Sequence, residues 1–187
     1  VFTQKRYFEA YLWGAAGQLP DESRIFGHEY APGITAGDDI FTVMSSDIFR
    51  GSAFALGYVN PDNLRGMNIW SDMYKVIRKA NLMLARMDEC QDMTALDRRN
   101  YTGYIHFLRG YAYYHILMTC GPAILVGDEI FESNLEGPAY NTYRATYDET
   151  VEYICSELET AAAYLPLKAS IAQFERPTKG AAYALIA

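Results

Sequence analysis

Apolar residues recur at three- and four-residue spacing along several stretches of the chain, and each such stretch predicts an amphipathic helix. The strongest run covers residues 101–120, where aromatic and aliphatic side chains form one wide face. We expect it to end at Gly121-Pro122, because a proline directly after a glycine stops a helix. Gly110 lies in the middle of this run, where glycine is costly. We therefore expect another helix to cross closely at that point.

Four other segments carry the same periodicity, and helices are predicted over residues 3–16, 69–88 and 146–165 and from Pro177 onward. Thr94 is suited to cap the 101–120 helix. Thr146 and Glu149 form a capping box at the start of the next helix. Pro177 suits the first helical position, where its missing N–H is not needed.

No strand ladder is visible, so the sequence predicts an all-α chain of five helices. Antiparallel helix pairs of this size resemble helical-repeat packing. No period of about 34 residues is strong enough to identify tetratricopeptide repeats directly.

Two long stretches, about residues 20–66 and 127–145, interrupt this helical pattern and are rich in glycine, proline and polar residues. A long irregular segment inside a helical domain is more often functional than not. The first stretch and the residues just after it mix aromatic rings with amide and guanidinium groups. A sugar site needs both, the rings for the apolar face and the polar groups for the hydroxyls. The candidate ligand-binding residues are Phe49, Arg50, Phe54, Tyr58, Asn60, Asn63, Arg65 and Asn68. An ordinary connecting loop with a few buried anchors is the alternative.

Composition narrows the possible partners. The 187 residues carry a net charge of −7, with 50% hydrophobic and 21% charged residues, as in an ordinary globular chain. The negative charge disfavours nucleic acid and anionic membranes, since both favour a basic face. No apolar run approaches the length of about 18 residues that a membrane-spanning helix needs. The chain starts without a methionine or a signal peptide and ends inside a helical pattern, so we expect a processed or truncated segment.

Metal and cofactor chemistry find little support in the sequence. The three cysteines lack CxxC spacing, and we expect buried free thiols at Cys90, Cys120 and Cys155. His106 and His115 are nine residues apart and do not form the i, i+4 pair of a helical metal site. We predict no metal site and no cofactor.

Catalytic constellations are also weak. No GxSxG elbow is present. The acids Asp38, Asp39 and Asp47 are better explained as solvated loop acids or a helix cap than as a general acid–base pair. The sequence lacks the oxygen-ligand spacing of an EF-hand, so it gives no support for a calcium site. We predict that the protein is not an enzyme.

Several polar and aromatic residues within the helices have structural explanations. Asn81 falls on an apolar stripe with Trp70 and Tyr74, and we expect its amide to bond a neighbouring backbone. Arg109 is expected to tie loop carbonyls or a carboxylate to the core, with ligand contact as the less favoured alternative. Six aromatic residues of the 101–120 run are interpreted as packing residues rather than a sugar platform: Tyr101, Tyr104, Phe107, Tyr111, Tyr113 and Tyr114.

Four sequence segments, taken together in their order and spacing, form a motif set that is more specific than any one of them. They are Trp70-x3-Tyr74-x2-Ile77-x2-Ala80-Asn81-x2-Leu84, Phe107-Leu108-Arg109-Gly110-Tyr111-x-Tyr113-Tyr114-x2-Leu117 running into Gly121-Pro122, Arg144-Ala145-Thr146-Tyr147-x-Glu149 leading to Leu165-Pro166, and Arg176-Pro177-Thr178-Lys179-Gly180. Together they resemble the SusD/RagB family of outer-membrane nutrient-binding lipoproteins. The family usually has alanine where Gly110 stands.

The resemblance implies an all-α fold of tetratricopeptide-like helix pairs with long ordered loops. It identifies residues 1–187 as a single N-terminal helical segment of a longer SusD-like protein. Such a protein, of the Bacteroidetes type, would be lipid-anchored on the extracellular face of the outer membrane. There it would serve nutrient uptake by capturing oligosaccharides and passing them to a SusC-like TonB-dependent transporter. A peptide-binding RagB-type receptor and a tetratricopeptide-like interaction scaffold remain alternatives, and a hydrolase is the weakest.

Overall fold

The computed structural model describes residues 2–20, 36–38, 51–60, 62–64, 69–131, 143–170 and 174–187. The chain divides into two compact units. Unit 1 comprises Val1–Gln18 and Asp72–Ala187, and unit 2 comprises Leu19–Ser71. In the described ranges all regular secondary structure is helical, apart from one isolated β-bridge between Asn60 and Asn63. The predicted all-α fold class is confirmed.

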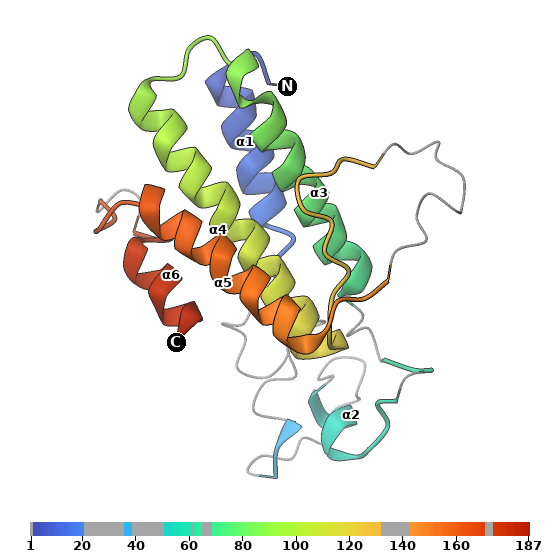
Figure 1. Ribbon diagram of the computed structural model, residues 1–187. Helices are drawn as coiled ribbons and strands as arrows, with labels where there is room; N and C mark the ends of the chain where they lie inside the picture. Colours follow the sequence, from blue (N-terminus) through green and yellow to red (C-terminus); the bar gives the residue numbers. More distant parts are fainter. Residues whose placement is uncertain are drawn as a thin grey trace. The chain divides into compact units, whose positions relative to one another are not determined.

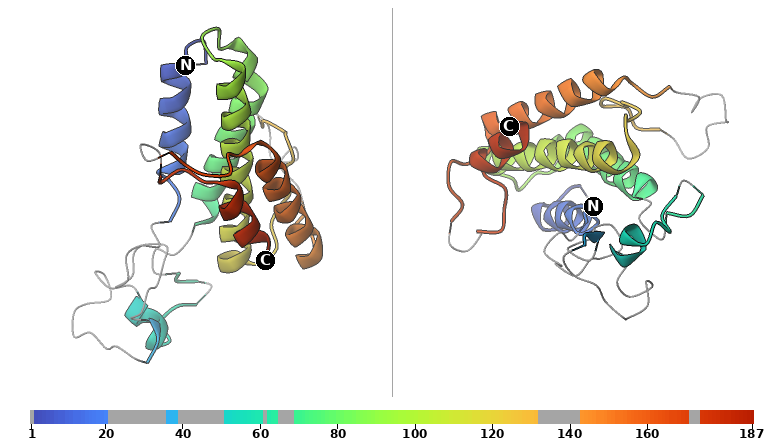
Figure 2. Two further views of the ribbon diagram at one scale, coloured as in Figure 1. Left: turned by 90° about the vertical axis from the view of Figure 1, so that its left-hand side faces the viewer. Right: turned by 90° about the horizontal axis from the view of Figure 1, so that it is seen from below.

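Unit 1 is organised around α4 (Ala95–Cys120), its longest helix. Helix α5 (Tyr147–Tyr164) packs along α4, and α6 (Lys179–Ile186) packs on α5 (Figure 1). The right-hand view of Figure 2 shows α4 lying between α5 on one side and α1 (Lys5–Ala16) on the other. Helix α3 (Trp70–Arg86), followed by a 3-10 turn over Met87–Glu89, completes the array beside α4.

Two glycines of α4 allow α5 to approach closely. A Cβ added at Gly110 would lie 3.2 Å from Glu157 Cβ and 3.2 Å from Leu158 Cγ. The expected close helix crossing at Gly110 is therefore confirmed. Gly103, one heptad earlier, is even more tightly placed, because its Cβ would lie 3.0 Å from the backbone nitrogen of Leu165. The absence of side chains at these positions brings the two backbones together.

Helix boundaries follow the capping residues. Thr94 caps α4 in a capping box with Asp97, as predicted for a cap, and α4 therefore begins at Ala95 rather than near residue 101. The capping box of Thr146 and Glu149 on α5 is confirmed. The positive φ of 78° at Gly121 ends α4 where the sequence predicted.

The predicted start of the last helix is wrong. Thr178, with extended backbone, is the N-cap of α6, so Pro177 lies outside the helix. The amide of Lys179 donates to the carbonyl of Pro166 at 3.0 Å. This contact with the start of the α5–α6 connection, rather than the proline, accompanies the boundary.

The tyrosine-rich run of α4 divides into two groups. Tyr101, Tyr104 and Tyr113 are buried in the core. Helix α1 packs on this face, with the rings of Phe8 and Tyr101 at 5.8 Å and the hydroxyl of Tyr101 bonded to Glu9. A second group, half-buried and mutually stacked, lies along another line of the helix: Phe107, Tyr111 and Tyr114.

All three cysteines are free thiols, but only Cys90 is buried. The expectation of burial is wrong for Cys120 and Cys155, which are half-buried because they lie at the edge of the helix interfaces. Among the described helices, none combines the length and apolar character required to cross a membrane.

Candidate functional site

The described part of the candidate loop contains an exposed apolar ridge, defined by Phe54, Leu56 and Tyr58. It begins in the short helix α2 (Gly51–Ala55) of unit 2. The three side chains are 45%, 47% and 53% exposed. Large apolar side chains grouped in this way on a surface commonly mark a binding site.

The backbone of the ridge is ordered by its own hydrogen bonds. Gly57 has a φ of 71°, a conformation that glycine adopts without strain. Its amide donates to the carbonyl of Phe54 at 3.0 Å, and the amide of Tyr58 donates to the carbonyl of Ala53 at 2.8 Å. These two bonds form a Schellman motif at the end of α2. The ridge is therefore presented on a defined turn.

A second turn follows the ridge. The amide of Asn63 donates to the carbonyl of Asn60 at 3.0 Å, and the amide of Asn60 donates to the carbonyl of Asn63 at 3.2 Å. The side-chain Oδ1 of Asn60 accepts from the amides of Asp62 and Asn63, both at 3.0 Å. Asn60 therefore uses its side-chain oxygen to close its own turn. Asn60, Asp62 and Asn63 are all exposed in this turn, which follows the ridge in the chain.

The structure thus places Tyr58, Asn60 and Asn63 on one short, exposed segment. The other candidate ligand-binding residues lie outside the described residues: Phe49, Arg50, Arg65 and Asn68. Of the acids considered above, Asp39 and Asp47 also lie outside them, whereas Asp38 is exposed.

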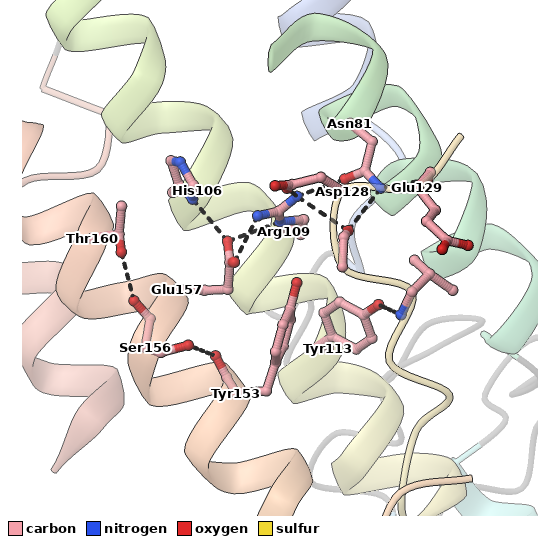
Figure 3. Close-up of polar contacts among 12 residues, drawn as sticks. Asn81, His106, Arg109, Tyr113, Asp128, Glu129, Tyr153, Ser156, Glu157 and Thr160 are labelled. Carbon is pink, nitrogen blue, oxygen red and sulfur yellow. Dashed lines mark hydrogen bonds and ion pairs between the residues drawn. The ribbon is translucent and has the colours of Figure 1, made fainter. Parts of the chain in front are cut away.

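Unit 1 contains a buried polar network that centres on Arg109 (Figure 3). The guanidinium is 2% exposed and binds Glu157 of α5 in a bidentate pair, with Nε–Oε2 at 2.8 Å and Nη2–Oε1 at 2.7 Å. Its third nitrogen, Nη1, donates to Oδ1 of Asn81 at 2.7 Å and to Oδ1 of Asp128 at 2.6 Å. One side chain therefore joins α3, α4, α5 and the segment after α4.

The segment over residues 123–131 is held through its backbone by side chains of α3 and α4. Asn81 Nδ2 donates to the carbonyls of Gly127 and Glu129 at 2.9 and 2.8 Å. The hydroxyl of Tyr74 donates to the carbonyl of Ile124 at 2.9 Å and accepts from its amide at 2.7 Å. These bonds supply the partners that an extended buried backbone would otherwise find in a sheet.

Two more side chains bond the backbone of this segment. The hydroxyl of Tyr113 accepts from the amide of Val126 at 3.1 Å. Arg78 donates to the carbonyl of Phe131 through Nε and Nη2, at 3.3 and 3.2 Å. Trp70 opens α3 and is half-buried.

Within the network, Arg109 and Glu157 keep each other charged. Burial opposes ionisation of Arg109, yet its bonds to Glu157 and the charge of that carboxylate raise its pKa overall. Burial raises the pKa of Glu157, but the bonds from His106, at 2.9 Å, and from Arg109 outweigh it, and the pKa is lowered overall. Both groups therefore stay charged and paired, which suits a structural tie rather than proton transfer. Among the described residues, no group of three or more His, Cys, Asp or Glu side chains is placed to hold a metal ion.

Glu157 was not predicted from the sequence as the partner of Arg109. A signal was present, because Glu157 lies three residues after Ile154 and four before Ala161, on the buried stripe of α5. A carboxylate on such a stripe needs a buried partner.

Comparison with known proteins places these features in a family. The family model SusD-like, described as "Starch-binding associating with outer membrane", matches residues 36–187. No curated protein matches the sequence.

Solved structures with the same fold include a SusD-like protein from Bacteroides fragilis, with a TM-score of 0.76 and 22% identity over 99% of this chain and 34% of that protein. A laminarin-binding SusD-like protein matches with a TM-score of 0.76 and 23% identity over 99% of this chain and 39% of that one. Surface glycan-binding protein A from Bacteroides uniformis matches with a TM-score of 0.74 and 21% identity over 98% of this chain and 41% of that protein.

The chain thus spans less than half the length of these structures. They share the helical fold with it over nearly the whole of this chain. Since the family model covers most of the chain, the protein belongs to the SusD-like family of starch-binding proteins that associate with the outer membrane.

Proposed function

We propose that this protein is a cell-surface glycan-binding protein that captures oligosaccharides and passes them to a SusC-like TonB-dependent transporter. In this proposal it binds its cargo without chemical conversion. It acts on the extracellular face of the outer membrane, held there by a lipid anchor in the full protein. The family description supports the link to starch-like glycans and to the outer membrane. Two proteins of the same fold carry laminarin-binding and glycan-binding in their names.

The observation that carries the proposal is the exposed ridge of Phe54, Leu56 and Tyr58. A flat aromatic ring on the surface can stack on the apolar face of a pyranose, and neighbouring amide and carboxylate groups can bind its hydroxyls. The turn next to the ridge provides such groups in Asn63 and Asp62. Because both turns are closed by backbone bonds, little conformational entropy would be lost on binding.

The remaining residues of this site stay predictions. Phe49, Arg50, Arg65 and Asn68 have the chemistry of the same kind of site, and the longer relatives contain chain that has no counterpart here. A peptide cargo, as in a RagB-type receptor, would use the same apolar ridge with different polar partners. A scaffold of the tetratricopeptide kind would instead use polar residues from successive helices.

Calorimetry on the full protein against a panel of neutral oligosaccharides tests the proposal. The Tyr58→Ala variant should lose most of the binding heat, because it removes the most exposed ring of the ridge. Tyr7→Ala is the matched control, since Tyr7 is also about half exposed, at 52%, but lies on α1. An Arg65→Ala variant tests the predicted hydroxyl-binding guanidinium in the same way.

Each outcome has a defined meaning. Heat that disappears with Tyr58→Ala and persists with Tyr7→Ala supports both the cargo and the site. If the binding heat persists in both variants, the glycan function stands and the binding site lies elsewhere than the ridge. Peptide binding in the absence of any glycan binding would refute the proposed cargo.

A further inference from the structure

A surface hollow of about 500 Å³ lies in unit 1, on the side of α5 that faces two extended segments. The segments cover residues 123–126 and 143–146, and they are joined by a bond from the amide of Ala145 to the carbonyl of Ala123 at 2.8 Å. The residues that line the hollow are Leu125, Ala145, Glu149, Glu152, Tyr153 and Ser156. A volume of this size lies within the range of about 300–1,000 Å³ that is usual for small-molecule sites.

The walls of the hollow are held in place on both sides. The bonds of Tyr74 to Ile124 and of Tyr113 to Val126 fix the backbone on either side of Leu125. The opposite wall is the first part of α5, whose start is fixed by the capping box of Thr146 and Glu149. A site between a rigid helix and a segment bonded in this way is preformed, which favours ligand binding.

The side chains in the hollow combine apolar and hydrogen-bonding surface. Leu125 and Ala145 provide the apolar part. Burial raises the pKa of the Tyr153 hydroxyl to about 12, and the charge of Glu157 and a hydrogen bond to its carboxylate also raise it, so the hydroxyl stays protonated and donates to Glu157 while the ring lines the hollow. Ser156 Oγ donates to the carbonyl of Tyr153 at 2.8 Å, which leaves its lone pairs to accept. Glu152, one helical turn before Ser156, is exposed.

The charges of the lining restrict what can bind. Glu149 and Glu152 are acidic, and none of the lining residues is basic. Arg144, next to Ala145 in the chain, directs Nη1 to the carbonyls of Cys120 and Pro122, at 2.8 and 3.3 Å. An anionic ligand would therefore meet two carboxylates, whose repulsion acts within a Debye length of about 8 Å at physiological salt.

We propose that this hollow is a second saccharide-binding site, separate from the ridge of Phe54, Leu56 and Tyr58, and that it takes neutral sugar units and rejects sulfated or uronate-containing ones. The carboxylates and Ser156 Oγ accept hydrogen bonds from neighbouring sugar hydroxyls, and Leu125 with Ala145 contacts the apolar face of the ring. The inference rests on the proposed glycan function, and it specifies the glycan class.

Calorimetry on the full protein, with a neutral glucan oligosaccharide and its sulfated derivative, tests the inference. Ser156→Trp fills the hollow from an exposed position and should weaken binding of the neutral glucan by about tenfold, equivalent to the loss of about 1.4 kcal/mol. Glu152→Gln should increase the affinity for the sulfated glucan. Glu159→Gln is the matched control, because Glu159 is exposed on the same side of α5 two turns later and does not line the hollow.

The outcomes separate the inference from the proposed function. Weaker binding with Ser156→Trp, unchanged binding with Glu159→Gln and a gain for the sulfated glucan with Glu152→Gln support the site. If Ser156→Trp binds neutral glucan like the unmodified protein while Tyr58→Ala does not, the inference is refuted and the proposed function stands. If the unmodified protein binds no glycan, both fail. A circular dichroism melt of Ser156→Trp that matches the unmodified protein shows that the fold is retained.

Discussion

Replacing Arg109 by leucine tests whether the buried network supports the fold of unit 1. The change would leave Glu157, whose side chain is 8% exposed, without its cation and with His106 and Tyr153 as its hydrogen-bond partners. Oδ1 of Asn81 would lose the bond from Arg109 that it accepts at 2.7 Å. The substituted leucine has no group that can replace either bond.

The magnitude follows from the separate losses. Breaking a buried ion pair by removing one partner costs about 3–5 kcal/mol. Leaving a buried acceptor without its donor costs about 1–3 kcal/mol. The losses overlap, so we expect a decrease of about 5 kcal/mol in the free energy of unfolding, a large share of the stability of a typical domain.

The double variant Arg109→Leu/Glu157→Leu separates charge pairing from simple loss of packing. With both partners apolar, no unpaired charge remains, so the double variant should be about 2–3 kcal/mol more stable than the Arg109→Leu single variant. Unfolding in urea provides the free energies. Hydrogen exchange at the amides of Ile124 and Val126 reports on the segment that the network helps to hold.

The control is Lys75→Leu, which removes an ion pair of similar length, Nζ–Oδ1 at 2.7 Å to Asp72, from the surface. We expect no measurable loss of stability, since exposed pairs contribute little. A double variant that is no more stable than the single variant would refute the argument that the unpaired Glu157 charge causes the loss. Unchanged exchange at residues 124 and 126 in Arg109→Leu would show that the network does not hold the segment.

Three further predictions concern helix contacts, capping and pH. Gly103→Ala should destabilise the protein, because the new Cβ would lie 3.0 Å from the backbone of Leu165. In contrast, Gly14→Ala, with nothing within 4 Å, should stabilise α1 by about 0.5–1 kcal/mol in a thermal melt. Thr94→Ala removes the cap of α4 and should cost about 1 kcal/mol in urea unfolding, whereas a change below the error of that measurement would contradict the capping role. Burial acts to raise the pKa of Glu157, but the bonds from His106 and Arg109 lower it overall from the ordinary value of 4.5. Such a carboxylate stabilises the fold above the pKa of the unfolded chain, and the stabilisation is lost as pH falls through the lower folded value. Glu157→Gln should therefore reduce the slope of stability against pH below about 4.5, and an unchanged slope would count against the assigned pairing.

Much of the helix array could be predicted because its signals are local. The periodicity of residues 101–120, the capping residues Thr94 and Thr146 and the stop at Gly121 all act within about one or two turns of the chain. Gly110 also predicted one tertiary contact, the close crossing of another helix, since a costly glycine in mid-helix is best explained by a close neighbour. The predicted start of α6 at Pro177 was wrong, because the backbone bond from Lys179 to Pro166 forms only in the folded chain and has no local sequence signal.

Contacts between residues that are distant in the chain could not be predicted from local sequence signals. Arg109 and Glu157 are 48 residues apart, and their contact requires that particular faces of α4 and α5 meet. Likewise, the sequence suggested the side chain of Asn60 as a ligand group, while the folded turn engages its Oδ1 with two amides. The sequence by itself determined five of the helices, the caps at Thr94 and Thr146 and the close crossing at Gly110, because these depend on neighbours along the chain, whereas the short helix α2 was not predicted. Only the tertiary structure decided which buried charges pair and which loop carbonyls they bind, because those contacts depend on how distant helix faces pack.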